Sequence, residues 1–356
     1  MKQEKTASAR PAEKNKLMPL IIALTVVTVL AAAALIVYAV KQGVRTDPKY
    51  FTITDGVVTE YTGTDERTVT LPDGVVVVGE RAFIGHEEIE KLVLPATLTT
   101  LRNGAFYGCA NLREISFAGA LSFIGDAAFG GCTSLTEITL PASVQYIHSE
   151  AFYGDTALTA ISVAEGNENF LSLDGVIYTA DAATLLTYPA GRTAAGYSLS
   201  EQTETIAMGA FLGNTYLREI GLGQVREIGT EAFLGCTGIE SLTLPGTVEK
   251  VYDNAFEGCA GLKELKLEEG VKIFGTAAFA DCAALTRVEL PESMEEIGPA
   301  CFHDCTALTY VSFPAEMMGI FETAFEGCSA LTIYGYADSP AQAYAETYEI
   351  PFKTLD

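Results

Sequence analysis

Cysteine, histidine and carboxylate side chains are the groups in this 356-residue chain that could do chemistry. The densest grouping is Cys301-Phe302-His303-Asp304-Cys305, which combines two thiols, an imidazole and a carboxyl group. Thiolate and imidazole groups are zinc ligands, and a Cys next to a His can also be a nucleophile. Whether these groups converge depends on the elements that carry them.

The surrounding pattern argues against a metal site. Cys301 directly precedes Phe302, His303 directly follows it and Cys305 comes three residues after it. The same three positions recur around other phenylalanines of the chain, and we expect their side chains to point in different directions. A tetrahedral zinc site needs ligands that converge. We therefore predict no metal, and since no phosphate-binding loop, HExxH motif or catalytic triad is present, no cofactor and no enzymatic activity.

The recurring slots belong to a repeat. One stretch, residues 124–141, reads IGDAAFGGCTSLTEITLP, and its phenylalanine recurs at intervals of 23 residues, with one interval of 22 and one of 59. The ten repeat phenylalanines are Phe83, Phe106, Phe129, Phe152, Phe211, Phe233, Phe256, Phe279, Phe302 and Phe325. A constant period of this length predicts a solenoid in which each copy buries its apolar face against the next.

Each copy carries the same local pattern. The L-x-x-I-x-L run alternates as a short strand with one buried face, and the Pro that often follows ends it. The A-F-x-G-C part predicts a tight turn or short helix on the opposite side of the coil. We expect an α/β solenoid of about ten 23-residue coils, with a parallel sheet on one flank and coils about 4.8 Å apart.

The slot three residues after the phenylalanine favours a structural ladder. Its side chains would point inward and hydrogen-bond the backbone of the turn, with Cys acting as a small buried residue. An in-register ladder does not provide disulfide geometry, so we predict free, buried thiols. The ladder residues are Cys109, Cys132, Asn214, Cys236, Cys259, Cys282, Cys305 and Cys328.

The full pattern, I-x-x-x-A-F-x-G-C-x-x-L-x-x-I-x-L-P, resembles the BspA-like leucine-rich repeat family of bacterial surface proteins over roughly residues 75–336. The resemblance implies a leucine-rich repeat fold and a role in binding host matrix proteins or other cells. It implies no ligand residue, because the shared motif is the structural core itself.

The N-terminal segment predicts a membrane anchor. Residues 1–16 form a basic tail, and residues 17–40 contain no charge and are long enough to span a bilayer, as a transmembrane helix or signal anchor. The positive-inside bias places the tail in the cytoplasm and the repeats outside, so we expect a single-pass protein of the cell membrane. The alternative is a cleaved signal peptide and a secreted protein. Residues 41–50 form a linker.

Two related hairpin segments and a closing segment accompany the repeat. Residues 51–74 predict a β-hairpin cap that covers the first coil of a solenoid at 75–336, with Asp55-Gly56 at its turn. The same module recurs within residues 165–200 and predicts a β-hairpin insert, which either serves structure or marks a binding site. Residues 337–356 predict a closing cap, in which Ser339 and Pro340 begin a short helix.

Two surfaces could meet a partner. The strand face carries small or polar residues such as Ser116, Thr139 and Thr243. The slot after each phenylalanine is apolar in the first coils, and this possible partner-binding ridge comprises Ile84, Tyr107, Tyr153, Leu212 and Leu234. The ridge is either a site for a protein partner or local packing between neighbouring turns.

The charge limits the choice of partners. The formal net charge is −24 at pH 7, which disfavours nucleic acid and serves either solvation or the recruitment of cations and basic partners. We expect a membrane-anchored extracellular binding scaffold with an adhesion role, whose partner is a protein or glycan at the cell surface. The alternatives are a structural envelope spacer or assembly protein, and a glycan-binding accessory protein.

Overall fold

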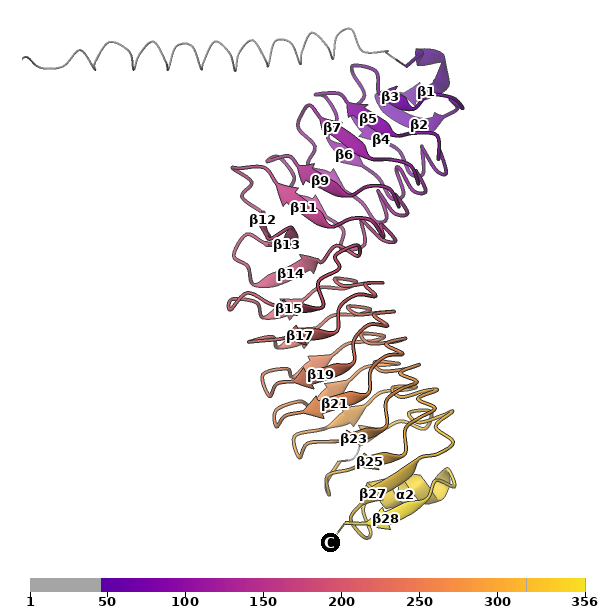
Figure 1. Cartoon of the computed structure of the whole chain (residues 1–356), viewed down its shortest axis with the longest axis vertical. Helices are drawn as coiled ribbons and strands as arrows, with labels where there is room; N and C mark the ends of the chain where they lie inside the picture. The colour runs from indigo at the N-terminus through magenta and orange to yellow at the C-terminus, as the bar shows by residue number, and fades with distance from the viewer. Residues whose placement is uncertain (1–45, 318, 356) are drawn as a thin grey trace, which may run out of the picture. The chain divides into compact units, whose positions relative to one another are not determined.

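The computed structural model describes residues 46–317 and 319–355, and the basic tail and the predicted membrane segment 17–40 lie outside them. Within the described part, no helix is both long and apolar enough to cross a membrane. These residues form a stack of coils that runs in chain order from the first hairpin to a single α-helix at the far end (Figure 1).

Each coil contributes two strands. The longer one is the predicted L-x-x-I-x-L strand, and its outer residues alternate with buried ones, as in Glu137–Leu140. The bounds are β5 Lys91–Leu94, β7 Glu114–Phe117, β9 Glu137–Leu140, β11 Ala160–Val163, β17 Glu219–Gly221, β19 Ser241–Leu244, β21 Glu264–Leu267, β23 Arg287–Glu289, β25 Tyr310–Ser312 and β27 Thr332–Gly335.

The second strand of each coil has two residues and lies just before the turn. These strands are β4 Val77–Val78, β6 Thr100–Leu101, β8 Phe123–Ile124, β10 Tyr146–Ile147, β16 Thr205–Ile206, β18 Glu227–Ile228, β20 Lys250–Val251, β22 Ile273–Phe274, β24 Glu296–Ile297 and β26 Gly319–Ile320. The longer strands pair in parallel as expected, but the sequence did not predict this second row of strands. A two-residue strand has a single inward residue, so it leaves no alternation by which the sequence could reveal it.

The A-F-x-G-C part is a turn rather than a helix. The residue two positions after each phenylalanine has a positive φ, as at Gly108 (φ 75°), which explains why the repeat places glycine there. Asp281 and Asp304 adopt the same conformation with φ of 58° and 54°. Between the strands, the repeat phenylalanines stack coil on coil, with centroids of successive rings 4.5–5.8 Å apart.

Three further layers extend the stack. The first consists of η2 (Pro48–Tyr50), the hairpin β1 (Phe51–Thr54) and β2 (Val57–Tyr61), and β3 (Thr68–Thr70), which pairs in parallel with β5. The hairpin turns at Asp55 and Gly56, both with positive φ, as the Asp-Gly pair predicts. Tyr61 then stacks on Phe83 at 4.9 Å and takes the place of a repeat phenylalanine.

The insert repeats this arrangement. It contains β12 (Phe170–Leu173), β13 (Val176–Thr179), β14 (Thr184–Thr187) and β15 (Gly196–Ser198), with Asp174 and Gly175 at the hairpin turn. β14 pairs in parallel with β16, β15 pairs in parallel with β17, and Tyr188 stacks on Phe211 at 4.8 Å. The insert is therefore a starting layer for the coils that follow it.

The insert also divides the interior. One hydrophobic core comprises residues between Phe51 and Ile161 together with Ile177, and a second comprises residues between Val176 and Ala345. The two-residue strands likewise form two sheets, one ending at β10 and the other beginning with β12. We call residues 51–163 the first arc and residues 170–354 the second arc.

The last layer closes the second arc. Helix α2 (Pro340–Thr347) begins with Ser339 as its N-cap, whose hydroxyl accepts a hydrogen bond from the Gln342 amide. The chain then forms β28 (Phe352–Thr354), which pairs with β27. These elements occupy the segment in which the sequence predicts a cap helix.

Candidate interaction surfaces

The ladder slot lies inside the turn. Each cysteine in it points its Sγ at the carbonyl oxygen of the phenylalanine in the preceding coil, 3.1–3.6 Å away, as Cys259 does to Phe233. Asn214 fills the same slot after the insert and donates to the carbonyls of Ala190 and Arg192, both at 3.1 Å. A carbonyl oxygen can accept two hydrogen bonds, and the side chain in this slot supplies the second one to a carbonyl of the turn.

All eight cysteines, each within the described residues, are free and buried. Burial raises the pKa of the Cys109 and Cys236 thiols to about 12. A protonated thiol is neither a nucleophile nor a metal ligand, so this environment suits packing rather than chemistry.

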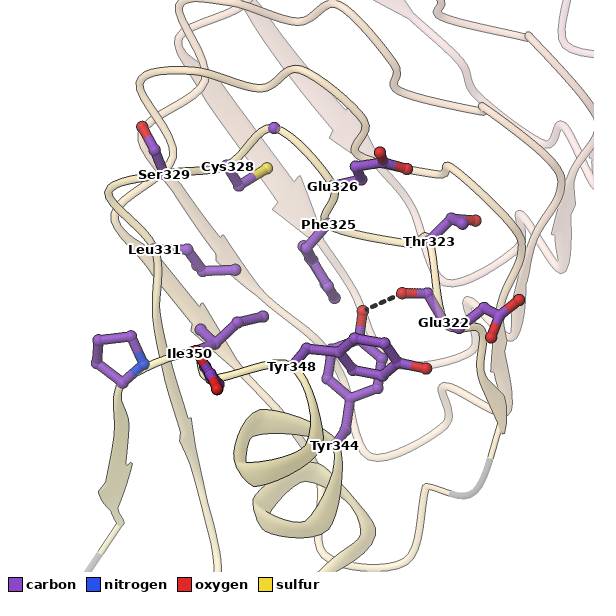
Figure 2. A pocket seen from close by; sticks show the side chains of 13 residues that line it. Glu322, Thr323, Phe325, Glu326, Cys328, Ser329, Leu331, Tyr344, Tyr348 and Ile350 are labelled. Carbon is purple, nitrogen blue, oxygen red and sulfur yellow. Dashed lines mark hydrogen bonds between the residues drawn. The ribbon is translucent and has the colours of Figure 1, made fainter.

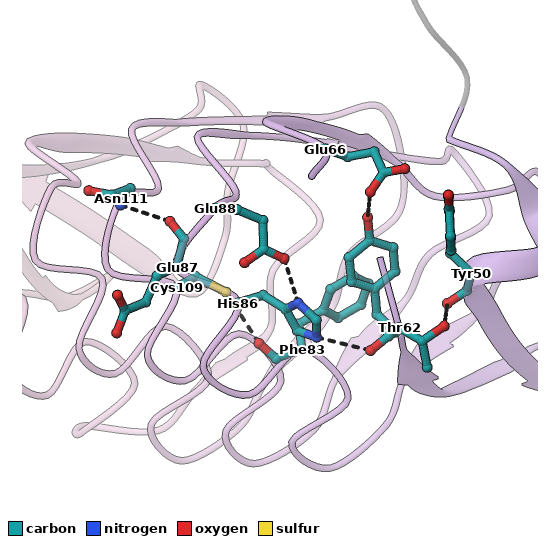
Figure 3. A network of polar contacts seen from close by, with 10 residues as sticks. Tyr50, Thr62, Glu66, Phe83, His86, Glu87, Glu88, Cys109 and Asn111 are labelled. Carbon is teal, nitrogen blue, oxygen red and sulfur yellow. Dashed lines mark hydrogen bonds and ion pairs between the residues drawn. The ribbon is translucent and has the colours of Figure 1, made fainter. Parts of the chain in front are cut away.

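The first ladder position is taken by a histidine. His86 Nε2 lies 2.9 Å from the carbonyl oxygen of Tyr61, and its Nδ1 lies 2.6 Å from Glu88 Oε1. Figure 3 shows the His86 ring beside Glu88. The Tyr61 hydroxyl donates to Glu66 at 3.1 Å. This network fixes the first layer onto the first coil, which explains why the slot holds a longer side chain here.

Asp155 takes the slot in the last coil of the first arc, and it differs from the others. Its Oδ1 accepts a hydrogen bond from the Cys132 amide at 2.7 Å, while its buried Oδ2 has no partner among the described residues. Burial raises the pKa of this carboxyl group well above its usual value. A neutral Asp155 could donate from Oδ2, as the other slot residues do.

The cluster at 301–305 does not converge. Cys301 and Cys305 are fully buried in separate slots, and His303 lies at the surface with Nδ1 3.3 Å from Asp304 Oδ2. His148 Nδ1 lies 3.6 Å from Asp126 Oδ1 in another coil. In the part of the chain that the structure describes, no group of three or more His, Cys, Asp or Glu side chains could hold a metal ion.

The ridge is exposed at its first three positions. Ile84, Tyr107 and Tyr153 are 51%, 39% and 49% exposed, whereas Leu212 and Leu234 are half-buried. The coil between the two tyrosines has Gly130 in this slot, and an added Cβ there would lie 2.9 Å from the Tyr107 ring. The Tyr107 ring therefore covers Gly130 and carries the apolar surface across that coil.

A second exposed group was not predicted. Phe123 in β8 and Tyr146 in β10 are 37% and 47% exposed, and their rings stack with centroids 4.9 Å apart. Val76, next to β4, is 40% exposed. The signal was present in the sequence, because both aromatic residues stand six positions before a repeat phenylalanine in successive coils.

A third feature lies at the end of the second arc. A cavity of about 500 Å³ lies between the turn of the last coil and α2, and Figure 2 shows the side chains that line it. Phe325, Cys328 and Leu331 line one side, and Tyr344, Tyr348 and Ile350 line the other. The sequence did not indicate this pocket, because its far wall has no repeat.

Parallel strands stacked at one coil per 22 or 23 residues around a ladder of aromatic rings define a leucine-rich repeat solenoid. Such a solenoid is a scaffold for interactions, built on surfaces that the stacked coils hold in place. The model of the BspA type leucine rich repeat region matches residues 60–172 and 204–332 in six copies. The chain belongs to this family.

Solved structures agree with this fold. The crystal structure of the pneumococcal vaccine antigen PcpA is similar, with a TM-score of 0.68 and 23% identity, over 82% of this chain and 79% of that one. A leucine-rich repeat protein from Eubacterium ventriosum is similar with a TM-score of 0.59 and 22% identity, over 76% of this chain and 88% of that one. No curated protein matches the sequence.

Proposed function

We propose that this protein is a membrane-anchored surface scaffold that binds a protein or glycan outside the cell, and that its role is adhesion. The observation that carries the proposal is the row of exposed apolar side chains on the turns of the first arc, above all Tyr107 and Tyr153. Large aromatic residues on a rigid surface supply binding energy at a small cost in conformational entropy.

The comparison within the solenoid supports this surface. In the second arc the same slot holds Leu212 and Leu234, which are half-buried, and then Glu257, Ala280, His303 and Glu326. If this slot served only packing between turns, nothing would restrict its exposed large apolar side chains to the first arc. Family membership supports the surface location, and the uncharged segment 17–40 supports the anchor.

The experiment is a binding assay with the full-length chain in detergent against a defined panel of matrix proteins, glycans and cell-envelope fractions. We expect saturable binding to one class. The double substitution Tyr107→Ser and Tyr153→Ser should weaken this binding at least tenfold, because two aromatic contacts are lost. Saturable binding to none of the panel would favour the envelope spacer.

A matched control uses the same slot in the second arc. Glu257→Ser and His303→Ser change the residue of this slot at equivalent turns without touching the exposed apolar row or the C-terminal pocket. If the control weakens binding as much as the tyrosine variant does, the ridge is not the binding surface.

Glycan binding is the second candidate, favoured by the stacked pair Phe123 and Tyr146. Their sheet ends at β10, so no following two-residue strand extends it beyond Tyr146. Aromatic side chains have an apolar body that can lie against the C–H face of a sugar. Phe123→Ser together with Tyr146→Ser should then abolish glycan binding, while the ridge variant should leave it intact.

A further inference from the structure

The turns of this solenoid are joined by a regular ladder of backbone hydrogen bonds. The amide of each repeat phenylalanine donates to the carbonyl before the next one, as Phe256 N does to Ala278 O at 2.8 Å. The amide two residues later donates to the carbonyl that follows the next phenylalanine, as Gly258 N does to Ala280 O at 2.9 Å. These two amides of each turn therefore take their carbonyls from the next turn along the chain. In several coils the amide two residues before the phenylalanine does the same, as Asn254 N does to Thr276 O at 2.8 Å.

Two turns lack those carbonyls. Among the described residues, the amides of Phe152 and Gly154 have no acceptor, and neither do those of Phe325 and Gly327. The first pair lies where the insert interrupts the ladder, and the second pair lies at its end. Gly327 is exposed, so its amide bonds water when no partner is present, and a ligand that offers carbonyl oxygens can replace that water.

Each of these turns borders a cavity, and the two cavities differ in size. The one that contains Phe152, Tyr153 and Tyr188 has a volume of about 20 Å³, which is room for about one water molecule. The C-terminal pocket beside Phe325 and Gly327 has a volume of about 500 Å³, within the range of ligand sites. Only the second can admit a molecule large enough to supply two acceptors.

The cap completes part of the last turn and leaves the rest. The Tyr344 ring meets Phe325 edge-on at 6.1 Å, and its hydroxyl donates to the carbonyl of Glu322 at 3.1 Å (Figure 2). Tyr344 therefore supplies the next aromatic ring, but the cap supplies no carbonyl to the two amides. Tyr348 packs on Tyr344 at 4.7 Å and remains 42% exposed, which gives the pocket an aromatic wall.

The charge around the pocket restricts the acceptor. Glu322, Glu326 and Glu349 line it and are exposed. An anionic ligand would meet these carboxylates, although two amide donors alone could bind one. A ligand that offers neutral carbonyl oxygens is not repelled by these carboxylates, and a positive charge on the same ligand is attracted to them.

We propose that the C-terminal pocket binds a basic polypeptide segment, which donates two backbone carbonyls two residues apart to the amides of Phe325 and Gly327. The segment continues the hydrogen-bond ladder by one turn and places a Lys or Arg against Glu326 and Glu349. This site lies apart from the ridge, and it rests on the proposed function only in that the partner is a polypeptide.

The test uses the full-length chain in detergent and a fluorescent peptide, acetyl-Lys-Ala-Phe-Lys-Gly-amide, whose Ala and Lys carbonyls flank one residue as in a repeat turn. We expect saturable 1:1 binding by fluorescence polarisation. In hydrogen–deuterium exchange, the peptide should slow the exchange of the amides at 323–328 and leave those at 152–154 unchanged. The latter pair is the internal control, since its cavity is too small for the peptide.

Four changes sharpen the assignment. Replacing both peptide lysines with glutamate, or the Ala carbonyl with a methylene, should weaken binding at least tenfold. Glu326→Lys with Glu349→Lys should do the same, and both side chains are exposed, so folding is not at risk. Tyr107→Ser with Tyr153→Ser should leave peptide binding unchanged, which separates this proposal from the ridge.

Binding that leaves the exchange at 323–328 unaltered would overturn the proposal, and so would equal affinity for the acidic peptide. Protection of these amides that rises with protein concentration in the absence of peptide would assign the pocket to a second copy of the chain. An inert ridge combined with a functional pocket would refute the proposed function alone.

Discussion

The two arcs have separate interiors of the same pattern and differ on the outside. In both, the repeat phenylalanines, the apolar strand residues and the thiol ladder occupy the same slots and are buried. Seven positions before the phenylalanine, however, the first arc has Val76, Thr99, Ser122 and Gln145, whereas the second arc has Glu204, Arg226, Glu249 and Lys272. The core therefore sets the fold, and the outer slots distinguish the two halves.

The outer slots suit different tasks. In the second arc, Arg226 bridges Glu204 and Glu249 at 3.8 and 3.7 Å, and Lys272 meets Glu249 at 3.2 Å, so charges alternate from coil to coil. Exposed ladders of this kind keep a repeated surface soluble. The first arc exposes Tyr107, Phe123, Tyr146 and Tyr153 on its turns and two-residue strands, whereas the exposed aromatic residues of the second arc, such as Tyr216 and Phe321, lie at other slots. Under the proposed function, the first arc would bind the partner and the second arc would support it.

The largest expected effect concerns the separation of the two cores. Phe129→Ala and Phe256→Ala each remove a fully buried ring and should cost about 3–5 kcal/mol. Since the cores are separate, each variant should first unfold its own arc, which hydrogen–deuterium exchange would show as lost protection in that half. Phe321→Ala, at a 44% exposed ring, is the control. Equal loss of protection in both arcs would mean that they unfold as one unit.

The next prediction concerns the ladder slot of Asp155, in the last coil of the first arc. Because the folded-state pKa of Asp155 is raised, its neutral form is favoured in the folded protein. Its contribution to stability is complete below the unfolded value of about 3.8, and it is lost as pH rises through the folded value. The first arc should therefore become less stable as pH rises through this window.

Asp155→Asn tests this linkage. The amide can donate as Asn214 does, so the variant should be about 1–3 kcal/mol more stable at pH above the window, with a flatter pH profile. Urea unfolding of both proteins across pH 3–8 measures the difference. Asp65→Asn, at an exposed carboxyl group of the same arc, should change neither value. A pH profile that Asp155→Asn leaves unaltered would contradict the assignment.

The interior could be predicted because it repeats. Ten phenylalanines in register identify the coils, and the Asp-Gly pairs identify the hairpins at 55–56 and 174–175. The layers begun by Tyr61 and Tyr188 could have been found too, since Tyr61 precedes Phe83 by 22 residues and Tyr188 precedes Phe211 by 23. Their flanking residues depart from the A-F-x-G-C pattern, which hid them.

The C-terminal pocket could not be predicted, because it depends on where a helix outside the repeat packs. A sequence can place α2 by Ser339 and Pro340, but not its distance from the last turn. The unpaired amides of Phe325 and Gly327 follow from that distance. The division of the interior likewise depends on how the insert docks, which neither its length nor its hairpin pattern determines.

A smaller effect tests whether the interior slots are equivalent. Cys132 and Cys259 hold the same slot in different arcs and point at turn carbonyls 3.6 and 3.3 Å away. Each Cys→Ala substitution should cost about 1 kcal/mol, since it removes a weak hydrogen bond and a little buried volume. The free energies of unfolding that urea titrations give for the two variants should therefore agree within about 0.5 kcal/mol. A loss of stability in only one of the two variants would mean that the slot contributes differently to stability in the two arcs.

The smallest effect is expected where the arcs look most different. Arg226 is 59% exposed and its ion pairs are long, so Arg226→Ala should change the free energy of unfolding by less than about 0.5 kcal/mol. Partner binding through the first arc should stay unchanged, because the row of charged side chains lies in the second arc. Thermal unfolding and the binding assay check both points, with Thr99→Ala as the matched change in the first arc.

Because solubility depends on the whole row of charges, only loss of the row, through Arg226→Ser with Lys272→Ser, should promote aggregation. If Arg226→Ala alone abolished partner binding, the charged ladder itself would be a recognition surface, and the division of labour between the arcs would be reversed.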